Sequence, residues 1–141
     1  MDHVAILSKK TKWLSKIISG EKTIESRWYR FKKTPYDVIK KDDIVYFKES
    51  GEPVTTVSDV SKVLFFENLD QEKIIKILKQ YGTGIGILVS YASMLKSKNY
   101  CTLIFLKNVK EIEPFQVNKT GFGMMSAWIS VDDINKIKRK A

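Results

Sequence analysis

A short amphipathic helix between two strand-like segments is the feature that most constrains the fold of this chain. Residues 4–7 read Val-Ala-Ile-Leu, which is typical of a buried strand. In residues 12–19 the large apolar side chains recur at one-four spacing, so they form one face that packs against the rest of the molecule. Thr11 is a plausible N-cap, and Gly20 is expected to end the helix in the left-handed conformation.

Charged side chains follow directly where this helix ends. Lys22 stands at the turn, while Glu25 and Arg27 are two residues apart and share one face of the following strand. Two of the three arginines in the chain, Arg27 and Arg30, lie in or beside this stretch, which indicates a use for the planar guanidinium fork. The cluster suits an anion, a phosphate or the edge of a base. Acid–base chemistry and an ordinary surface salt bridge are the alternatives.

The spacing Gly20-x-Lys22-x-x-Glu25-x-Arg27 resembles the signature of the ASCH domain family, which is a member of the PUA-like barrel superfamily. The strand and helix before it, and the Asp-Ile-Val-Tyr-Phe segment at 43–47, also resemble the opening of that family. The resemblance implies an α+β fold, namely a PUA-like β-barrel of five to seven mostly antiparallel strands flanked by about three helices. Residues 1–141 would form a single such domain.

The resemblance also implies binding of RNA or of a nucleotide in a basic cleft at the end of the first helix. Aromatic side chains beside arginines can stack on exposed bases, although they can equally pack inside the barrel. The glycine- and methionine-containing stretch at 114–128 is a second candidate lining, or else a loop that fills the core. The basic loop at 30–36 either covers the cleft or leaves it open. The expected nucleic-acid-binding residues are Lys22, Glu25, Arg27, Trp28, Arg30, Lys119 and Trp128.

A hydrolase in the same cleft is the alternative function. Some ASCH-like proteins are amidohydrolases that act on acetylated cytidine, and ribonuclease activity is attributed to the family as well. In the amidohydrolase branch a lysine, a threonine and a glutamate carry the chemistry. Lys22 matches that lysine, whereas Glu25 stands where the branch has its threonine. If this protein is an enzyme, Lys22 and Glu25 are the catalytic candidates. A protein-interaction module is a third possibility, for which the sequence gives no direct argument.

The composition narrows the classes of partner. The net charge of +9 favours an acidic partner and nucleic acid first, although the lysines are spread along the chain. No apolar run is long enough to span a membrane, and the first residues do not resemble a secretion signal, so we expect a cytoplasmic protein. With one histidine and one cysteine, no metal site or other cofactor is expected. Cys101 lies in an apolar run and is expected to be a buried, inert thiol.

The remaining periodicity predicts three further strands and two further helices. Asp70 is the expected cap of a helix that ends at Gly82, and Ser130 the expected cap of a last helix that runs into the basic C-terminus. Residues 87–96 fit either a helix or a strand. The predicted strands cover residues 44–48, 54–66 and 100–109.

Overall fold

A mixed sheet forms the frame of the computed structural model, which describes residues 1–123 and 125–140. Its strand order is β2-β5-β4-β3-β1-β6, with β7 added to one end of β5. The β1–β3 pair is parallel and the other described pairs are antiparallel. The predicted α+β barrel of mostly antiparallel strands is therefore confirmed. The strands are β1 (Asp2–Leu7), β2 (Ile24–Tyr29), β3 (Ile44–Glu49), β4 (Val54–Phe66), β5 (Tyr100–Val117), β6 (Trp128–Val131) and β7 (Lys138–Lys140).

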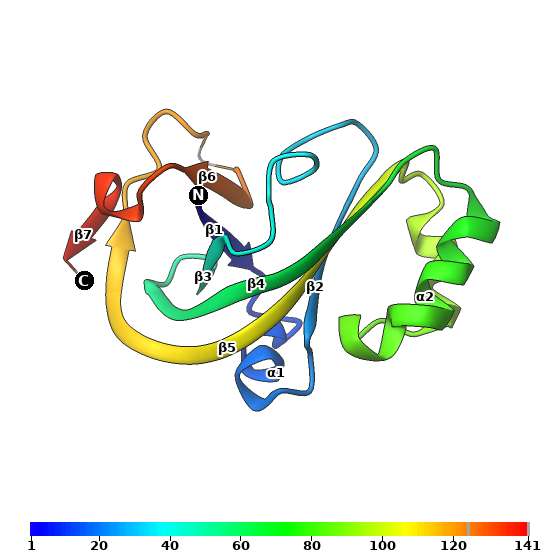
Figure 1. Ribbon diagram of the computed structural model, residues 1–141, viewed down its shortest axis with the longest axis horizontal. Coiled ribbons are helices and arrows are strands. Elements are labelled where there is room, and N and C mark those ends of the chain that lie inside the picture. Colours follow the sequence, from blue (N-terminus) through cyan, green and yellow to red (C-terminus); the bar gives the residue numbers. More distant parts are fainter. Residues whose placement is uncertain (124, 141) are drawn as a thin grey trace.

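Two long strands curl this sheet into a half-barrel (Figure 1). The register of β4 against β5 shifts at three places, and such irregularities bend a strand and increase its twist. Asn108 adopts a positive φ of 54° within β5, where its side chain donates to Asp59 Oδ2 at 2.9 Å. The curl brings β2 and β6, the two ends of the strand order, so close together that the Arg27 side chain of β2 contacts Trp128 of β6.

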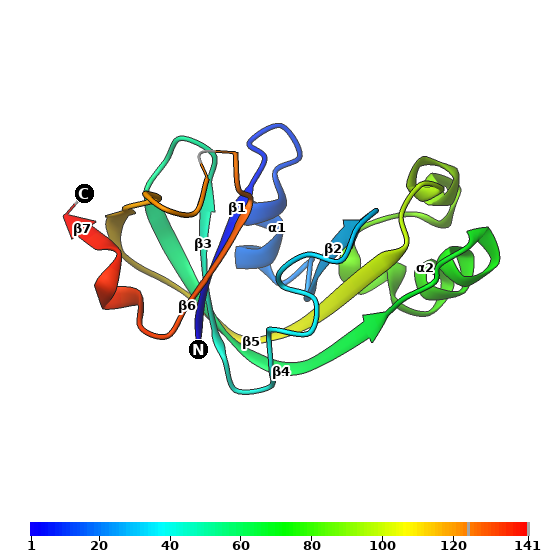
Figure 2. The same ribbon diagram turned by 90° about the horizontal axis from the view of Figure 1, so that it is seen from above.

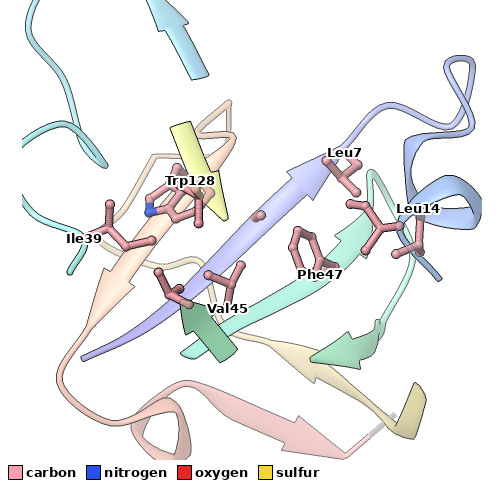
Figure 3. Close-up of a cluster of buried hydrophobic side chains, with 10 residues drawn as sticks. Leu7, Leu14, Ile39, Val45, Phe47 and Trp128 are labelled. Carbon is pink, nitrogen blue, oxygen red and sulfur yellow. The ribbon is translucent and has the colours of Figure 1, made fainter. Parts of the chain in front are cut away.

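Helices cover the bottom of the half-barrel and the outer face of β2 and β5 (Figures 1 and 2). The interior is filled from β1, β3, β6 and α1, and Figure 3 shows Leu7, Leu14, Val45, Phe47 and Trp128 converging there. A second cluster lies between α2, η1 and the β2–β5 pair and includes the predicted buried thiol of Cys101, whose pKa is raised by burial. The helices are α1 (Trp13–Ser19), α2 (Gln71–Ile85) and the short 3-10 helices η1 (Val89–Leu95) and η2 (Ile134–Lys136).

The helix α1 ends as predicted but begins differently. Gly20 has φ 84°, and its N–H donates to the carbonyl of Ile17 at 3.2 Å, so it is the left-handed C-cap. The prediction that Thr11 is the N-cap is wrong. Lys12 occupies that position with φ 56°, and the Thr11 hydroxyl instead donates to the Ser8 carbonyl at 3.1 Å.

The helix α2 is capped by Asp70, whose Oδ1 accepts from the Lys73 N–H at 2.8 Å, as expected. The predicted end at Gly82 is wrong, because the helix continues to Ile85, which is completely buried, and stops at Gly86 with φ 84°. Residues 89–95, which the sequence left undecided, form the 3-10 helix η1. Among the described residues, no helix has both the length and the apolarity needed to cross a bilayer.

The predicted last helix, capped by Ser130, is wrong. Residues Trp128–Val131 form strand β6, which pairs with β1. Trp128 and Ile129 are both buried but belong to different clusters on opposite faces, which is the period of a strand. The basic segment Lys138–Lys140 likewise pairs with β5 as strand β7.

Candidate functional site

The three charged residues of the sequence motif form one buried ion triad. Lys22 Nζ lies 3.3 Å from Glu25 Oε1, and Arg27 donates from NH2 to Glu25 Oε2 at 3.0 Å. The three side chains are between 2% and 11% exposed. They are therefore an interior network and not a solvated surface salt bridge.

Lys22 contacts four different parts of the protein besides the cavity described below, Glu25 among them. Its ammonium donates to the carbonyls of Ile24 at 2.8 Å and Ile85 at 2.6 Å. It also lies 4.7 Å from the centroid of the Trp13 ring. Burial lowers the pKa of Lys22, and the attraction of Glu25 partly offsets that effect. The lysine thus joins the end of α2 and the start of β2 beneath α1.

Glu25 compensates the two buried cations. Burial would raise the pKa of its carboxyl, but the charges and hydrogen bonds of Arg27 and Lys22 outweigh it and leave this pKa below its ordinary value. Oε1 also accepts from the backbone N–H of Ser26 at 3.0 Å. The carboxylate is therefore ionised and engaged at both oxygens.

Arg27 bridges the two ends of the curled sheet. From β2 it donates through NH1 to the carbonyl of Ala127 at 3.2 Å and through NH2 to the carbonyl of Ile6 in β1 at 3.4 Å. Its guanidinium lies 5.1 Å from the centroid of the Trp128 ring on β6. The arginine consequently fixes the open side of the half-barrel.

Two polar atoms beside this bridge have no hydrogen-bond partner. Among the described residues, Arg27 Nε and Thr102 Oγ1 are the fully enclosed side-chain atoms left unsatisfied. Arg27 and Thr102 face each other across the β2–β5 ladder, where opposite side chains are neighbours. Leaving such a group unpaired costs about 1–3 kcal/mol.

Aromatic and basic side chains surround this pair. Tyr36 makes edge contacts with Tyr100 at 5.1 Å and with Phe65 at 5.2 Å between ring centroids. Lys33 Nζ lies 5.4 Å from the centroid of the Tyr29 ring, and Lys32 Nζ lies 5.7 Å from that of Tyr36. The predicted basic loop at 30–36 therefore borders these rings. We call Tyr29, Tyr36, Tyr100, Arg27 and Thr102 the Arg27 site.

The structure brings some of the predicted binding residues together and separates others. Trp128 contacts Arg27, and Lys119 donates to the Ser126 carbonyl at 3.0 Å, next to the Ala127 carbonyl that Arg27 holds. Trp28 packs on the opposite face of the sheet, against the cluster beneath α2. Arg30 is exposed and lies 5.4 Å from the Phe31 ring centroid.

A buried polar network behind Trp128 was not predicted. His3 is fully buried, with Nε2 2.8 Å from Asp43 Oδ2 and Nδ1 2.8 Å from Ser130 Oγ. Trp128 Nε1 donates to His3 Nδ1 at 3.2 Å, which makes Nδ1 an acceptor and places the ring proton on Nε2. The lone histidine of the chain was the sequence signal for this network.

A cavity lies where the sequence predicted a basic cleft. It has a volume of about 520 Å³ at the end of α1, and Lys16, Lys22, Lys79 and Glu21 contribute to its lining. Most of the other lining residues are apolar or glycine. In the described part of the chain, no group of three or more His, Cys, Asp or Glu side chains is arranged to hold a metal ion.

The chain combines a curled α+β sheet with a first helix that leads into a buried Lys–Glu–Arg triad. The ASCH domain model matches residues 7–139, so this chain belongs to the ASCH domain family. No curated protein sequence matches. The crystal structure of ASCH from Zymomonas mobilis is similar, with a TM-score of 0.69 at 11% identity over 99% of this chain and 96% of that one. A tyrosine-to-phenylalanine mutant of that protein gives 0.70 at 12%, covering 96% and 93%. At these identities the likeness shows the fold alone.

Proposed function

We propose that this protein binds RNA or a nucleotide and that an exposed base occupies the Arg27 site. The observation that carries the proposal is the adjacent, buried and unpaired Arg27 Nε and Thr102 Oγ1. One is a donor and the other is a hydroxyl that both donates and accepts. A nucleobase edge offers donors and acceptors within a few ångströms of each other. Because both protein atoms are enclosed, the surrounding side chains must move aside for a base to pair with them.

The surroundings of the pair suit a base with its phosphates. Tyr29 and Tyr100 are half-buried, so their rings are partly open to a planar ligand. Lys32 and Lys33 lie over the tyrosine rings, where they can neutralise flanking phosphates. Family membership and the net charge of +9 also favour nucleic acid. Single-stranded RNA exposes unpaired bases, whereas the bases of a duplex are stacked and paired, so single-stranded RNA is the expected polymer.

The hydrolase alternative receives no support from the surroundings of its two catalytic candidates. The Lys22 ammonium donates to two backbone carbonyls and the side chain is 2% exposed. Glu25 is engaged by Lys22, Arg27 and the Ser26 N–H. Although Lys22 contributes to the lining of the cavity at the end of α1, an amidohydrolase or a ribonuclease would have to free at least one of these groups from its present partners. Hydrolysis by an amidohydrolase or a ribonuclease is therefore the second candidate function, after base binding at the Arg27 site.

Thr102→Val tests the proposal, because it removes the unpaired hydroxyl while keeping the shape of the side chain. We expect the variant to fold at least as stably as the wild type and to bind short single-stranded RNA about tenfold more weakly in a tryptophan fluorescence titration. Thr55→Val in β4 is the matched control, since within the described part of the chain the one hydrogen bond of the Thr55 hydroxyl is to that of Thr56, at 3.3 Å. Wild-type affinity of Thr102→Val for every RNA and nucleotide that the wild type binds would refute the site.

A further inference from the structure

A groove formed by two neighbouring cavities lies between α1 on one side and α2 and η1 on the other. The cavity of about 520 Å³ at the end of α1 adjoins a second one of about 380 Å³. Both are lined by Lys16, Gly86 and Ile87, so the two cavities lie side by side on this face. The second part is mainly apolar, with Trp13, Tyr91 and Met94 in its wall.

The rim of the groove exposes an unusual amount of apolar side chain. Leu88 is 69% exposed, Tyr91 52% and Met94 73%, all within seven residues at η1. Scattered exposed apolar residues are ordinary, but a concentration of them beside a groove marks an interaction surface.

The core does not require these side chains to be apolar. In the same short helix Ala92 is buried against α2 and accepts a hydrogen bond from Gln71 through its carbonyl at 2.8 Å. Leu95 packs on the same cluster. One side of η1 thus holds the helix in place, while Leu88, Tyr91 and Met94 are left to the solvent.

The floor of the groove is fixed before any partner arrives. Gly86 lies against the Trp13 ring, and a Cβ added there would meet the ring at 2.9 Å. Lys22 holds the carbonyl of the preceding Ile85 from below. A rigid floor lowers the entropy that binding must overcome.

The charges beside the groove select the kind of partner. Lys16 and Lys79 contribute to the lining, against one acidic residue, Glu21. A second copy of this chain would bring the same positive surface and a net charge of +9, so self-association is disfavoured. Most of the exposed apolar side chains are aliphatic, whereas nucleic acid bases prefer aromatic platforms. Methionine and leucine suit the side chains of another protein.

We propose that this groove docks an acidic amphipathic segment of a partner protein. The apolar face of the segment would cover Leu88, Tyr91 and Met94, and its carboxylates would lie beside Lys16 and Lys79. This is the mode in which an amphipathic helix occupies a hydrophobic groove. The site is separate from the Arg27 site, so the two proposals stand or fall independently.

Selection of peptides from a random 16-residue display library on the whole protein tests the groove. The enriched peptides should carry net negative charge and large apolar residues at helical spacing. Their affinity should fall at least tenfold for Leu88→Asp/Met94→Asp. Met125→Asp is the matched control, because Met125 is 95% exposed on the loop before β6, and it should bind as the wild type does.

Three results would overturn the docking proposal. They are no enrichment of any peptide, enriched peptides that are basic or unpatterned, and equal binding to the wild type and the double variant. A dimer in light scattering that Leu88→Asp/Met94→Asp converts to a monomer would show that a second copy covers the groove. RNA binding should be unchanged in the double variant, so loss of RNA binding would point to nucleic acid as the occupant.

Discussion

Replacement of Glu25 by glutamine should destabilise the fold strongly, although the side chain keeps its size. The glutamine places an N–H₂ group against Lys22 or Arg27, so a donor meets a donor where an ion pair stood. Breaking a buried ion pair by removing one partner typically costs about 3–5 kcal/mol. For a chain of this length, the lower value corresponds to a fall of about 6–12 °C in the melting temperature.

The assay is urea unfolding followed by tryptophan fluorescence at pH 7 and at pH 4. The pKa of Glu25 is lowered below the ordinary 4.5, so its stabilising charge is fully present above pH 4.5 and is lost as the pH falls through the folded-state pKa. The difference between wild type and Glu25→Gln should therefore shrink in acid. Glu72→Gln is the control, because its pair with Lys76 is 80% exposed on the glutamate side. Equal loss in the two variants at pH 7 would refute the buried ion triad as a stabilising unit.

Three further predictions concern single residues. Burial lowers the pKa of His3, although the hydrogen bond and charge of Asp43 act in the opposite direction, so NMR should give its imidazole a pKa below 6.5. The free energy of unfolding should fall as the pH drops through 6.5, because the unfolded chain then binds the proton more readily than the folded one. A measured value above 6.5 would contradict this. Lys48 is 7% exposed, and both burial and Lys119 lower its pKa, so Lys48→Met should raise the free energy of unfolding by about 1 kcal/mol in urea. A lower free energy would mean that the ammonium is stabilised in the fold. Gly86→Ala should destabilise more than Gly51→Ala in the same experiment. Both glycines have positive φ, but only the first would bring a Cβ against Trp13, so equal losses would count against a rigid floor.

Local periodicity predicted most of the frame. The strand at 54–66 has the predicted bounds, and Asp70 and Gly20 act as caps, since these features depend on neighbouring residues. The end of the chain was mispredicted, because Trp128–Val131 becomes a strand only by pairing with β1, more than 100 residues earlier in the sequence. The capping pattern at Ser130 depends on neighbouring residues alone, whereas the observed strand is stabilised by hydrogen bonds to the distant strand β1.

Only part of the site was predicted, because local sequence patterns again gave no information on which strands pair. The motif supplied Lys22, Glu25 and Arg27: the last two share one face of β2, and Lys22 lies in the turn directly before that strand. Thr102 was missed, because its position opposite Arg27 depends on the register of β2 against β5. Only its hydroxyl in an apolar run marked it in the sequence. Trp28 packs against the cluster beneath α2, and the sequence alone did not show which face of β2 this helix covers.

The most direct test of base binding at the Arg27 site is the NMR signal of the Arg27 Nε–H group. The chain has three arginines, so this region of the spectrum contains few side-chain signals. On titration with short single-stranded RNA, the Arg27 Nε–H signal should shift downfield and exchange more slowly with water, because the unpaired donor gains an acceptor. An unchanged Arg27 signal at saturating RNA, with shifts confined to Arg30 or Arg139, would contradict the proposal.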